Sequence, residues 1–587
     1  MTHLAVPIAV PGVEAVEPAL ADAARAAEHG ADLIEWRIDV LDDAEAIAVL
    51  VEQSALPSVV TCRTEAEGGA FTGDGEELVD RYRAAIGGTR KPIAIDVELL
   101  RVEQDPTLAA ALSELSAACE RGLIFSTHDF TGRPADLTRR VAGMAEHPHC
   151  AIVKAAWRAR SLRDNLEAFD LMREYRSVKP IVALCMGEFG LPSRVLAGKF
   201  GGWMTFAAID AGKGTAPGQP TLDEIKRLYR WDRITARTPV YGVVGWPVGH
   251  SLSPHIHNAG FDALDEELSV DSWHGGVYLP MPIADAWEQF KATVGAWVDH
   301  DGLDFGGCSV TIPHKAHLLR FVADRDGGVE TLSDAIGAAN TLVAGKDEGR
   351  RTKDEVGGPD AESHALTDDR RRADADKQQA SSNHEPSSFV LRPSSLLRAF
   401  NTDYAAALDA VCEAMGIEHA MLQGVRVGVI GAGGAAAAIV AAFAAQGATV
   451  VVYNRTMSKA DALVDRFDGN TGKVVAAPLD KLCDTCCAVL INCTPVGMHP
   501  KIDATPAEGL FDGETLEHRI GHPPVVFDTI YNPAETRLLR EAKAAGCKTV
   551  SGVEMFVRQA AGQFAAWTGH AAPMDVFERV VHASLDR

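Results

Sequence analysis

Residues 425–456 read VRVGVIGAGGAAAAIVAAFAAQGATVVVYNRT. A strand, a glycine turn, an alanine-rich helix, a glycine stop and a second strand follow one another, which is the order of a Rossmann βαβ unit. Gly431, Gly433 and Ala436 form a G-x-G-x-x-A pattern, with Gly434 beside them. Such glycines allow a tight turn and let a pyrophosphate approach the helix N-terminus. The complete βαβ context makes this a strong prediction of a dinucleotide site, whereas the glycine pattern alone would be weak.

The end of the second strand favours one nicotinamide cofactor over the other. An NAD site usually places Asp or Glu about 20 residues after the first glycine, where it binds the ribose hydroxyls. Here the chain reads Asn454-Arg455-Thr456, with Lys459 nearby. A cationic pocket with a hydroxyl group suits a 2′-phosphate, so we predict NADP. The alternative, Arg455 as a solvated surface charge, does not explain the missing acid.

The first part of the chain shows a different pattern, in which apolar runs alternate mostly with amphipathic helical stretches. Eight such runs occur, at residues 3–10, 31–39, 57–63, 92–99, 123–130, 151–157, 180–187 and 203–209. Strands that are buried on both faces and alternate with helices predict a parallel sheet. Eight of these units predict a closed (β/α)₈ barrel, with its active site at the carboxyl ends of the strands. The predicted fold class is therefore α/β.

Lys154 lies inside one of these apolar strands. Burial disfavours the ammonium form of a lysine, lowers its pKa and exposes a nucleophilic amine, as imine formation with a ketone requires. The alternative is a structural ion pair with Glu35 or Glu98, and periodicity alone does not choose between the two. His128 could remove the proton next to an imine and later protonate a leaving hydroxyl. Three arginines could clamp a carboxylate or hydroxyls, although each alone is more often structural: Arg37, Arg63 and Arg194.

Five motifs make residues 1–230 recognisable: E-W-R-x-D (35–39), R-T-x-x-E-G-G (63–69), S-T-H-D-F (126–130), M-G-x-x-G-x-x-S-R (186–194) and T-A-P-G-Q (215–219). In this order they resemble type I 3-dehydroquinate dehydratase. The resemblance implies that Lys154 forms the imine, that His128 is the general acid and base, and that Glu67 assists it. It also implies eight substrate-binding residues: Glu35, Arg37, Arg63, Met186, Arg194, Phe206, Thr215 and Gln219. Thr215 stands where the family commonly has serine.

The second half carries another ordered set of motifs: G-H-S-L-S-P (249–254), V-T-I-P-H-K (310–315), G-A-A-N-T (337–341), N-T-D (401–403), N-C-T-P-V-G-M (492–498) and E-M-F-V-R-Q-A (554–560). Together with the βαβ unit they resemble shikimate dehydrogenase. The resemblance implies that Lys315 and Asp403 are the catalytic pair, since a lysine held by a carboxylate can give a proton to the alkoxide formed by hydride transfer. A structural ion pair is the alternative. Ser253-Pro254 also fits a helix N-cap followed by proline.

The same resemblance names further site residues. The substrate-binding positions are Ser251, Ser253, Thr311, Asn340, Tyr531 and Gln559. The cofactor-binding positions are Gly431, Gly433, Gly434, Ala435, Asn454, Arg455, Thr456, Lys459, Thr494, Met498 and Gly552.

The chain departs from this pattern between Thr341 and Asn401, where the family usually has a short hairpin. The segment is rich in Asp, Arg, Ser and Gly and poor in apolar residues, so we predict a disordered insert at 345–398. Whether Asn340 and Asp403 keep their positions around it is open. The predicted domains are a barrel (1–233), a substrate-binding domain (238–344, completed by helices at about 555–587) and a Rossmann domain (399–554).

Composition narrows the function classes. The net charge of −25 disfavours binding to nucleic acid or to anionic lipid, and no apolar run is long enough to span a bilayer. The first residues lack a basic region before Pro7 and read as a strand, not a signal peptide. An odd number of cysteines, 11 in all, suits reduced thiols in a cytoplasm. We read the cluster Cys483, Cys486 and Cys487 as structural thiols and predict no metal site.

These observations predict one enzyme with two consecutive activities, as in the dehydratase–dehydrogenase fusions of plants. The barrel would convert 3-dehydroquinate to 3-dehydroshikimate, and the second half would reduce this product to shikimate with NADPH. An alternative is quinate or quinate/shikimate dehydrogenase activity in the second half. A non-catalytic metabolite sensor is disfavoured because Lys154, His128, Lys315 and Asp403 are all present. The oligomeric state is not determined by the sequence.

Overall fold

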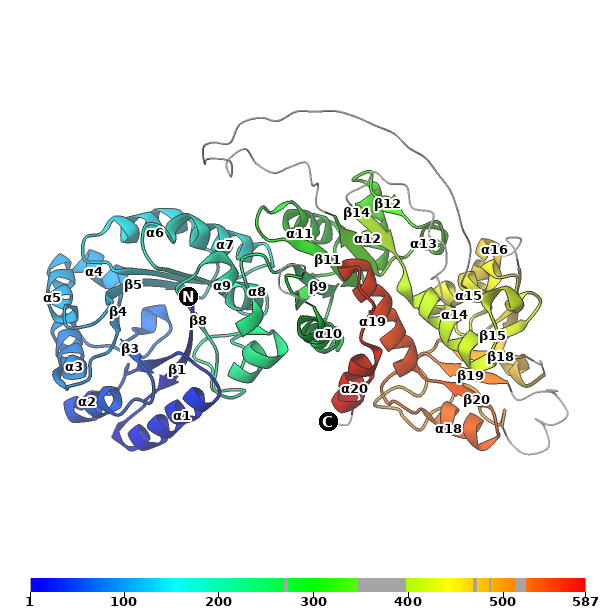
Figure 1. Cartoon of the computed structure of the whole chain (residues 1–587), viewed down its shortest axis with the longest axis horizontal. Helices are drawn as coiled ribbons and strands as arrows, with labels where there is room; N and C mark the ends of the chain where they lie inside the picture. Colours follow the sequence, from blue (N-terminus) through cyan, green and yellow to red (C-terminus); the bar gives the residue numbers. More distant parts are fainter. Residues whose placement is uncertain are drawn as a thin grey trace, which may run out of the picture.

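The chain forms three sheets arranged one after another (Figure 1). The computed structural model describes residues 2–268, 273–345, 397–467, 472–484, 487–511 and 524–585. The blue and cyan N-terminal part is a barrel, and two further sheets with their helices follow it in the green and the yellow-to-orange parts. In the described part of the chain, no helix combines the length and the apolar character needed to cross a membrane.

The first sheet is a barrel of eight parallel strands, which confirms the predicted (β/α)₈ fold. The strands are β1 (His3–Ala9), β2 (Leu33–Arg37), β3 (Ser58–Thr61), β4 (Ala94–Glu98), β5 (Gly122–Asp129), β6 (Ile152–Arg158), β7 (Ile181–Met186) and β8 (Met204–Phe206). Their order is β7-β6-β5-β4-β3-β2-β1-β8. A hydrogen bond from the Trp203 amide to the Ile181 carbonyl, 2.7 Å long, links β7 to the start of β8. The main surrounding helices are α1 (Val16–Glu28), α2 (Ala44–Glu52), α3 (Gly75–Gly87), α5 (Pro106–Ser116), α6 (Leu137–Glu146) and α7 (Asp164–Tyr175).

Alternation along the strands decides which side chains face the barrel interior. An apolar plug of Leu33, Val59, Ala94, Ile124 and Ile152 fills the interior near the amino ends of the strands. Because side chains two residues apart in a strand share a face, the residues that follow the plug at even spacing also point inward. The inward-facing positions that follow the plug in β2, β4, β5 and β6 are mostly polar. The barrel interior is therefore apolar near the amino ends of the strands and charged near their carboxyl ends.

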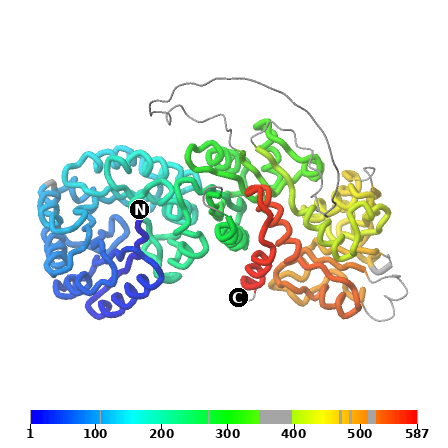
Figure 2. Tube along the Cα trace, in the orientation of Figure 1, coloured from blue at the N-terminus to red at the C-terminus, as the bar shows by residue number. Residues whose placement is uncertain are grey.

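The second sheet is mixed, with the strand order β10-β9-β11-β13-β14-β12. Its strands are β9 (Val240–Gly245), β10 (Val277–Pro282), β11 (Phe305–Val310), β12 (Gly328–Val329), β13 (Thr341–Ala344) and β14 (Leu397–Phe400). It is flanked by α10 (Ser253–Glu267), α11 (Trp287–Asp299) and α12 (Lys315–Ala323). The last two helices, α19 (Gly552–Thr568) and α20 (Met574–Leu585), return from the end of the chain to this sheet and share an apolar cluster with it (Figure 2).

The boundary expected for the insert is partly wrong. Leu397 and Arg398, which we placed inside it, belong to β14, where Leu397 pairs with Ala344 and Phe400 pairs with Thr341 of β13. Strand β14 is also part of the second sheet, so the Rossmann domain does not begin at Ala399. Leu397 and Ala399 are buried in alternation with their neighbours, a local pattern that the polar composition of the whole segment conceals. The remainder of the predicted insert, residues 346–396, lies outside the described residues.

The third sheet is parallel, with the Rossmann-like order β17-β16-β15-β18-β19-β20. Its strands are β15 (Arg426–Ile430), β16 (Thr449–Asn454), β17 (Lys473–Pro478), β18 (Val489–Asn492), β19 (Val525–Asp528) and β20 (Lys548–Val550). The helices around it are α14 (Thr402–Met415), α15 (Gly434–Ala445), α16 (Met457–Phe467) and α18 (Arg537–Ala544). Every residue of α15 from Ala436 to Ala444 is buried, since its small alanines let the helix pack between its neighbours.

The barrel and the second sheet make direct contacts. Lys199 is buried and donates hydrogen bonds to the Thr238 carbonyl at 3.0 Å and to Asp304 at 2.8 Å. Phe189, in the loop after β7, stacks on Trp246, in the loop after β9, with ring planes 8° apart and centroids 6.1 Å apart. Met186 and Arg194 lie on either side of the first loop and Ser251 lies on the second, so this contact is between segments assigned to the two activities.

Candidate active sites

A cavity of about 560 Å³ opens at the carboxyl ends of the barrel strands. All of the barrel residues that the sequence predicted for catalysis or binding line it: Glu35, Arg37, Arg63, Glu67, His128, Lys154, Met186, Arg194, Phe206, Thr215 and Gln219. These residues come from several different strands and the loops after them.

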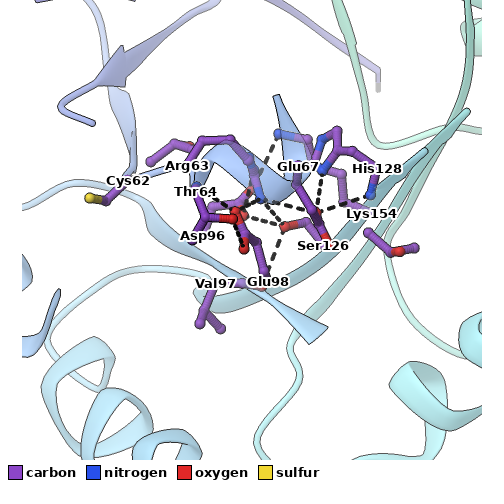
Figure 3. A network of polar contacts seen from close by, with 12 residues as sticks. Cys62, Arg63, Thr64, Glu67, Asp96, Val97, Glu98, Ser126, His128 and Lys154 are labelled. Carbon is purple, nitrogen blue, oxygen red and sulfur yellow. Dashed lines mark hydrogen bonds and ion pairs between the residues drawn. The ribbon is translucent and has the colours of Figure 1, made fainter. Parts of the chain in front are cut away.

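Lys154 lies at the floor of this cavity and is only 4% exposed. Its Nζ is 2.8 Å from Glu35 Oε1 and 3.0 Å from Asp96 Oδ2 (Figure 3 shows the lysine and this aspartate), and it lies 4.8 Å from the centre of the Phe206 ring. The surroundings of Lys154 are therefore not purely apolar as expected, because two carboxylates lie beside its amine in addition to the aromatic ring. The ion-pair alternative holds with Glu35, but Glu98 is not the second partner.

Asp96 is a site residue that the sequence analysis missed. It is fully enclosed, accepts a hydrogen bond from Arg63 Nη2 at 2.9 Å and touches Lys154 with its other oxygen. Burial opposes its charge, but Arg63 and Lys154 outweigh this and hold the pKa of Asp96 well below its usual range. The signal was present in the sequence: Asp96 and Glu98 alternate with apolar residues in the strand at 92–99, so both face the interior.

Arg63 is held by several acidic groups (Figure 3). Besides Asp96 it lies 3.5 Å from Glu98 and 3.7 Å from Glu67, and its Nη1 donates to Ser126 Oγ at 2.7 Å. Glu98 in turn accepts hydrogen bonds from the Thr64 amide and hydroxyl. The guanidinium group therefore also anchors the loop that carries Glu67, in addition to lining the cavity.

His128 and Glu67 form a hydrogen-bonded pair (Figure 3). Glu67 Oε2 lies 2.9 Å from the imidazole Nδ1 and accepts the His128 amide at 3.0 Å. Burial raises the pKa of Glu67 to about 8, and burial together with Arg63 and Lys154 lowers the pKa of His128. A protonated carboxyl can donate to Nδ1, whereas an ionised one accepts from Nδ1–H and leaves Nε2 free to take a proton. The pair can thus act as acid and as base.

The shift at Glu67 predicts a pH-dependent effect of the Glu67→Gln substitution on stability. The carboxyl titrates near 4.5 when unfolded and near 8 when folded, so the folded state retains a proton that the unfolded state loses. Its contribution to the free energy of unfolding therefore falls as the pH rises through this window. Thermal unfolding at pH 5, 6.5 and 8 should show Glu67→Gln gaining stability relative to the unsubstituted protein as the pH rises. If the unfolding temperatures of the two proteins change in parallel with pH, this prediction is contradicted.

Two polar groups in the cavity lack partners in the described part of the chain: Arg194 Nε and Gln219 Nε2. Arg194 is 3% exposed, and burial lowers its pKa to about 10. Gln219 uses its carbonyl oxygen to accept the Thr215 amide at 3.0 Å, which turns its amide nitrogen away. Buried donors without acceptors are costly, so an anionic ligand with several oxygens would satisfy this side of the cavity.

The second site contains Lys315, at the start of α12, and Asp403, in the first turn of α14. Lys315 Nζ is 2.5 Å from Asp403 Oδ2, and Asn340 Nδ2 donates to Asp403 Oδ1 at 2.9 Å. The lysine is about one-third exposed, whereas the aspartate is buried. The structure therefore brings these three predicted residues together, even though the insert separates Asn340 from Asp403 in the chain.

The remaining predicted substrate residues lie on several separate segments of the second half. Ser251 precedes α10 and accepts the Ser253 amide at 3.3 Å. The helix begins at Ser253 and Leu252 is its N-cap residue, so the N-cap alternative for Ser253 is wrong. Thr311 follows β11, Gln559 is partly buried on α19, and Tyr531 is 40% exposed and stacks on Phe556.

The start of α15 fits a dinucleotide phosphate group. Gly431 has φ +112°, which favours glycine, and Gly433 is the helix N-cap. Gly433, Gly434 and Ala435 are exposed at the end of an otherwise buried helix, and a Cβ atom on either glycine would meet nothing within 4 Å. Open space over a helix N-terminus is where phosphate oxygens bind.

The other predicted cofactor residues lie on the carboxyl side of the same sheet. Asn454 Nδ2 donates to the Thr456 carbonyl at 2.8 Å, and Arg455 and Lys459 beside it are exposed. Thr494 follows β18 and Met498, 45% exposed, lies on the same loop. Gly552 begins α19, where a Cβ atom would lie 2.3 Å from the Ile530 backbone.

Four family models match the chain in order. They are type I 3-dehydroquinase (residues 4–236), the shikimate dehydrogenase substrate-binding domain (243–342), shikimate/quinate 5-dehydrogenase (414–495) and the shikimate 5′-dehydrogenase C-terminal domain (552–582). The bifunctional 3-dehydroquinate dehydratase/shikimate dehydrogenase, chloroplastic, of Arabidopsis thaliana is 32% identical over 581 residues, covering 97% of this chain and 83% of that protein. The chain belongs to this bifunctional dehydratase/dehydrogenase family.

Further relatives match either the dehydrogenase half or nearly the whole of the chain. The shikimate dehydrogenase (NADP(+)) of Methanocella arvoryzae is 36% identical and covers 59% of the chain and 99% of its own length. A solved dehydroquinate dehydratase and shikimate dehydrogenase from S. pombe is 22% identical and covers 99% of the chain and 98% of its own, with a TM-score of 0.41. A Thermus thermophilus shikimate 5-dehydrogenase solved with NADP(H) and shikimate is 27% identical and covers 59% of the chain and 100% of its own, with a TM-score of 0.41.

Proposed function

We propose that the barrel dehydrates 3-dehydroquinate to 3-dehydroshikimate through an imine on Lys154, and that the second half reduces 3-dehydroshikimate to shikimate with NADPH. One observation supports the first activity most directly: a buried lysine, an acid–base pair and an arginine whose Nε has no partner among the described residues share one cavity. For the second, the close Lys315–Asp403 pair supports proton transfer. The proposed domains are the ranges predicted from the sequence, except that β14 belongs with the substrate-binding domain.

In the first reaction the Lys154 amine attacks the substrate ketone, and the carbonyl oxygen leaves as water to give the imine. The ammonium group must first lose a proton to solvent, and Glu35 and Asp96, both within 3.0 Å of Nζ, hold the lysine in place. The imine acidifies the adjacent C–H, and Nε2 of His128 removes that proton. The resulting enamine expels the hydroxyl group, which His128 protonates, and water then releases the product from the lysine.

Borohydride reduction during turnover tests the imine. Treatment of the full chain with borohydride and 3-dehydroquinate should give a stable secondary amine and abolish the dehydratase activity. Peptide mapping should place the added mass on Lys154. An adduct on another residue, or none, would contradict the mechanism.

Arg194 is proposed to bind the substrate carboxylate, because its buried guanidinium group lacks an acidic partner among the described residues. Replacement by glutamine should raise KM for 3-dehydroquinate about tenfold to a hundredfold, with a smaller change in kcat, since an ionic hydrogen bond contributes about 1.5–3 kcal/mol. Steady-state kinetics of the dehydratase check this. Shikimate oxidation serves as the control and should not change; an unaltered KM would rule out the assignment.

In the second reaction, bound NADPH supplies a hydride to the carbonyl carbon of 3-dehydroshikimate. The oxygen of that carbonyl needs a proton, and the ammonium group of Lys315 can donate it. Asp403 holds the lysine in place through the 2.5 Å contact. The proposed substrate contacts are Ser251, Ser253, Thr311, Asn340, Tyr531 and Gln559, and the proposed cofactor contacts are the glycine turn of α15 and the segments around Asn454, Thr494 and Gly552.

NADP preference is proposed to depend on Arg455, which is exposed at the end of β16 with no acidic residue at the position that would bind ribose hydroxyls. The Arg455→Ala substitution should raise KM for NADP⁺ about tenfold or more and leave KM for NAD⁺ nearly unchanged, since only the 2′-phosphate loses a cationic partner. Asp461→Ala, an exposed position six residues farther along the chain on α16, serves as a surface control. Equal effects on both cofactors would argue against this role.

Quinate remains the alternative substrate of the second half, because one matching family model is described as shikimate/quinate 5-dehydrogenase. Comparison of kcat/KM for shikimate and quinate decides between them. We also propose a cytoplasmic location, supported by the described cysteines, which are thiols and, apart from Cys493, buried. Of the predicted cysteine cluster, Cys487 is one of these buried thiols, whereas Cys486 and the side chain of Cys483 lie outside the described residues.

A further inference from the structure

One face of helix α19 follows strand β13 beside the second site. Gln559, Gln563 and Trp567 are four residues apart and so share this face. Trp567 Nε1 donates to the Leu342 carbonyl at 2.9 Å. Gln563 Nε2 donates to Thr341 Oγ1 at 3.2 Å and, more weakly, to the Asn340 carbonyl at 3.5 Å. Neither Gln563 nor Trp567 is among the site residues that the resemblance implied.

The contact from Gln563 determines where the Thr341 proton points. Thr341 has a single hydroxyl proton, and an amide nitrogen can only donate. Thr341 Oγ1 therefore accepts from Gln563 and directs its own proton to Asn340 Oδ1, 2.7 Å away. Gln563 is 2% exposed and Thr341 fully buried, so water does not offer a competing partner.

The orientation of the Asn340 amide follows from these donors. Its Oδ1 accepts from the Thr341 hydroxyl and from the Thr402 amide at 2.9 Å. The Nδ2 group must then face the other way, where it donates to Asp403 Oδ1 at 2.9 Å. This leaves Asp403 Oδ2 for Lys315. A continuous series of hydrogen bonds thus runs from α19 to the lysine.

We propose that Gln563 is a positioning residue for proton transfer in the dehydrogenase reaction. It acts through Thr341 and Asn340 to hold the Asp403 carboxylate in the orientation that Lys315 needs. The proposal rests on the role of Lys315 and Asp403 proposed above. It explains why a polar side chain is buried at a position where α19 otherwise packs through apolar residues such as Val557, Ala560 and Phe564.

The test compares Gln563→Met with Thr341→Val and with the double variant, all in the full chain. Methionine fills a similar volume but cannot donate. Each single substitution should lower kcat for shikimate oxidation about tenfold, the effect of losing one buried hydrogen bond. KM for shikimate and for NADP⁺ should change less than about twofold. Because both residues act in one series, the double variant should be no slower than the slower single variant.

Trp567→Phe is the matched control, since it removes a hydrogen bond from the same helix face to the same strand without touching the series. It should retain the kcat of the unsubstituted protein, and all variants should retain dehydratase activity. An unchanged kcat in Gln563→Met, an equal loss in Trp567→Phe, or additive losses in the double variant would overturn the proposal. Full activity in Lys315→Met would instead overturn the assignment of the catalytic pair, so the two failures are distinguishable.

Discussion

Replacement of Lys154 by arginine should reduce dehydratase activity by at least about a thousandfold, as expected when the nucleophile of a covalent mechanism is lost. Arginine retains a positive charge near Glu35 and Asp96, which lie 2.8 Å and 3.0 Å from the lysine Nζ. Its guanidinium group, however, cannot form the imine. Dehydratase kinetics check the loss, and shikimate oxidation by the same preparation should be unchanged.

Lys154→Met separates the chemical role of the lysine from its structural role. It should be equally inactive, but it also removes the cation that pairs with Glu35 and one of the two cations that pair with Asp96. Breaking a buried ion pair costs about 3–5 kcal/mol, so the barrel of Lys154→Met should unfold at a distinctly lower temperature than that of Lys154→Arg. Residual turnover in Lys154→Arg near that of the unsubstituted protein would refute an imine mechanism. Equal unfolding temperatures would show that the ion pairs contribute little.

Replacement of Lys315 by methionine should lower kcat for shikimate oxidation about a hundredfold to ten-thousandfold, the range expected for loss of a general acid or base. The lysine is about one-third exposed, and Asp403, although buried, keeps its hydrogen bond from Asn340 when the lysine is removed. Stopped-flow or steady-state measurement of NADPH formation checks the effect, and dehydratase activity should be retained.

Arg320→Met, on the same helix α12, is the matched control for this substitution because it also replaces a cation by methionine. The Arg320 side chain is 60% exposed and lies over the Trp287 ring, outside the proposed site. Arg320→Met should keep the activity of the unsubstituted protein. Comparable losses in the two variants would point to disturbance of α12 and not to proton transfer.

The barrel was predicted correctly because its strands carry a strong local signal: each is an apolar run bounded by helical stretches. The lysine in β6 and the histidine in β5 were found because charge inside such a run is conspicuous. Asp96 was missed although it alternates with apolar residues in the same way. Asp96 matters because it lies 3.0 Å from the Lys154 amine, and the two residues are 58 positions apart in the chain.

The folds of the two halves, the order of the activities and the residues that line the barrel cavity could be predicted from the chain alone, since they follow from periodicity and from motifs of neighbouring residues. The contacts between these side chains became visible only in the folded molecule. Lys154 contacts Asp96 and not Glu98, Arg194 has no acidic partner in the described chain, and Gln563 reaches the Asn340–Asp403 pair through Thr341. Hydrogen bonds and ion pairs act over about 3 Å. Residues far apart in the chain come within that range only when strands and helices pack.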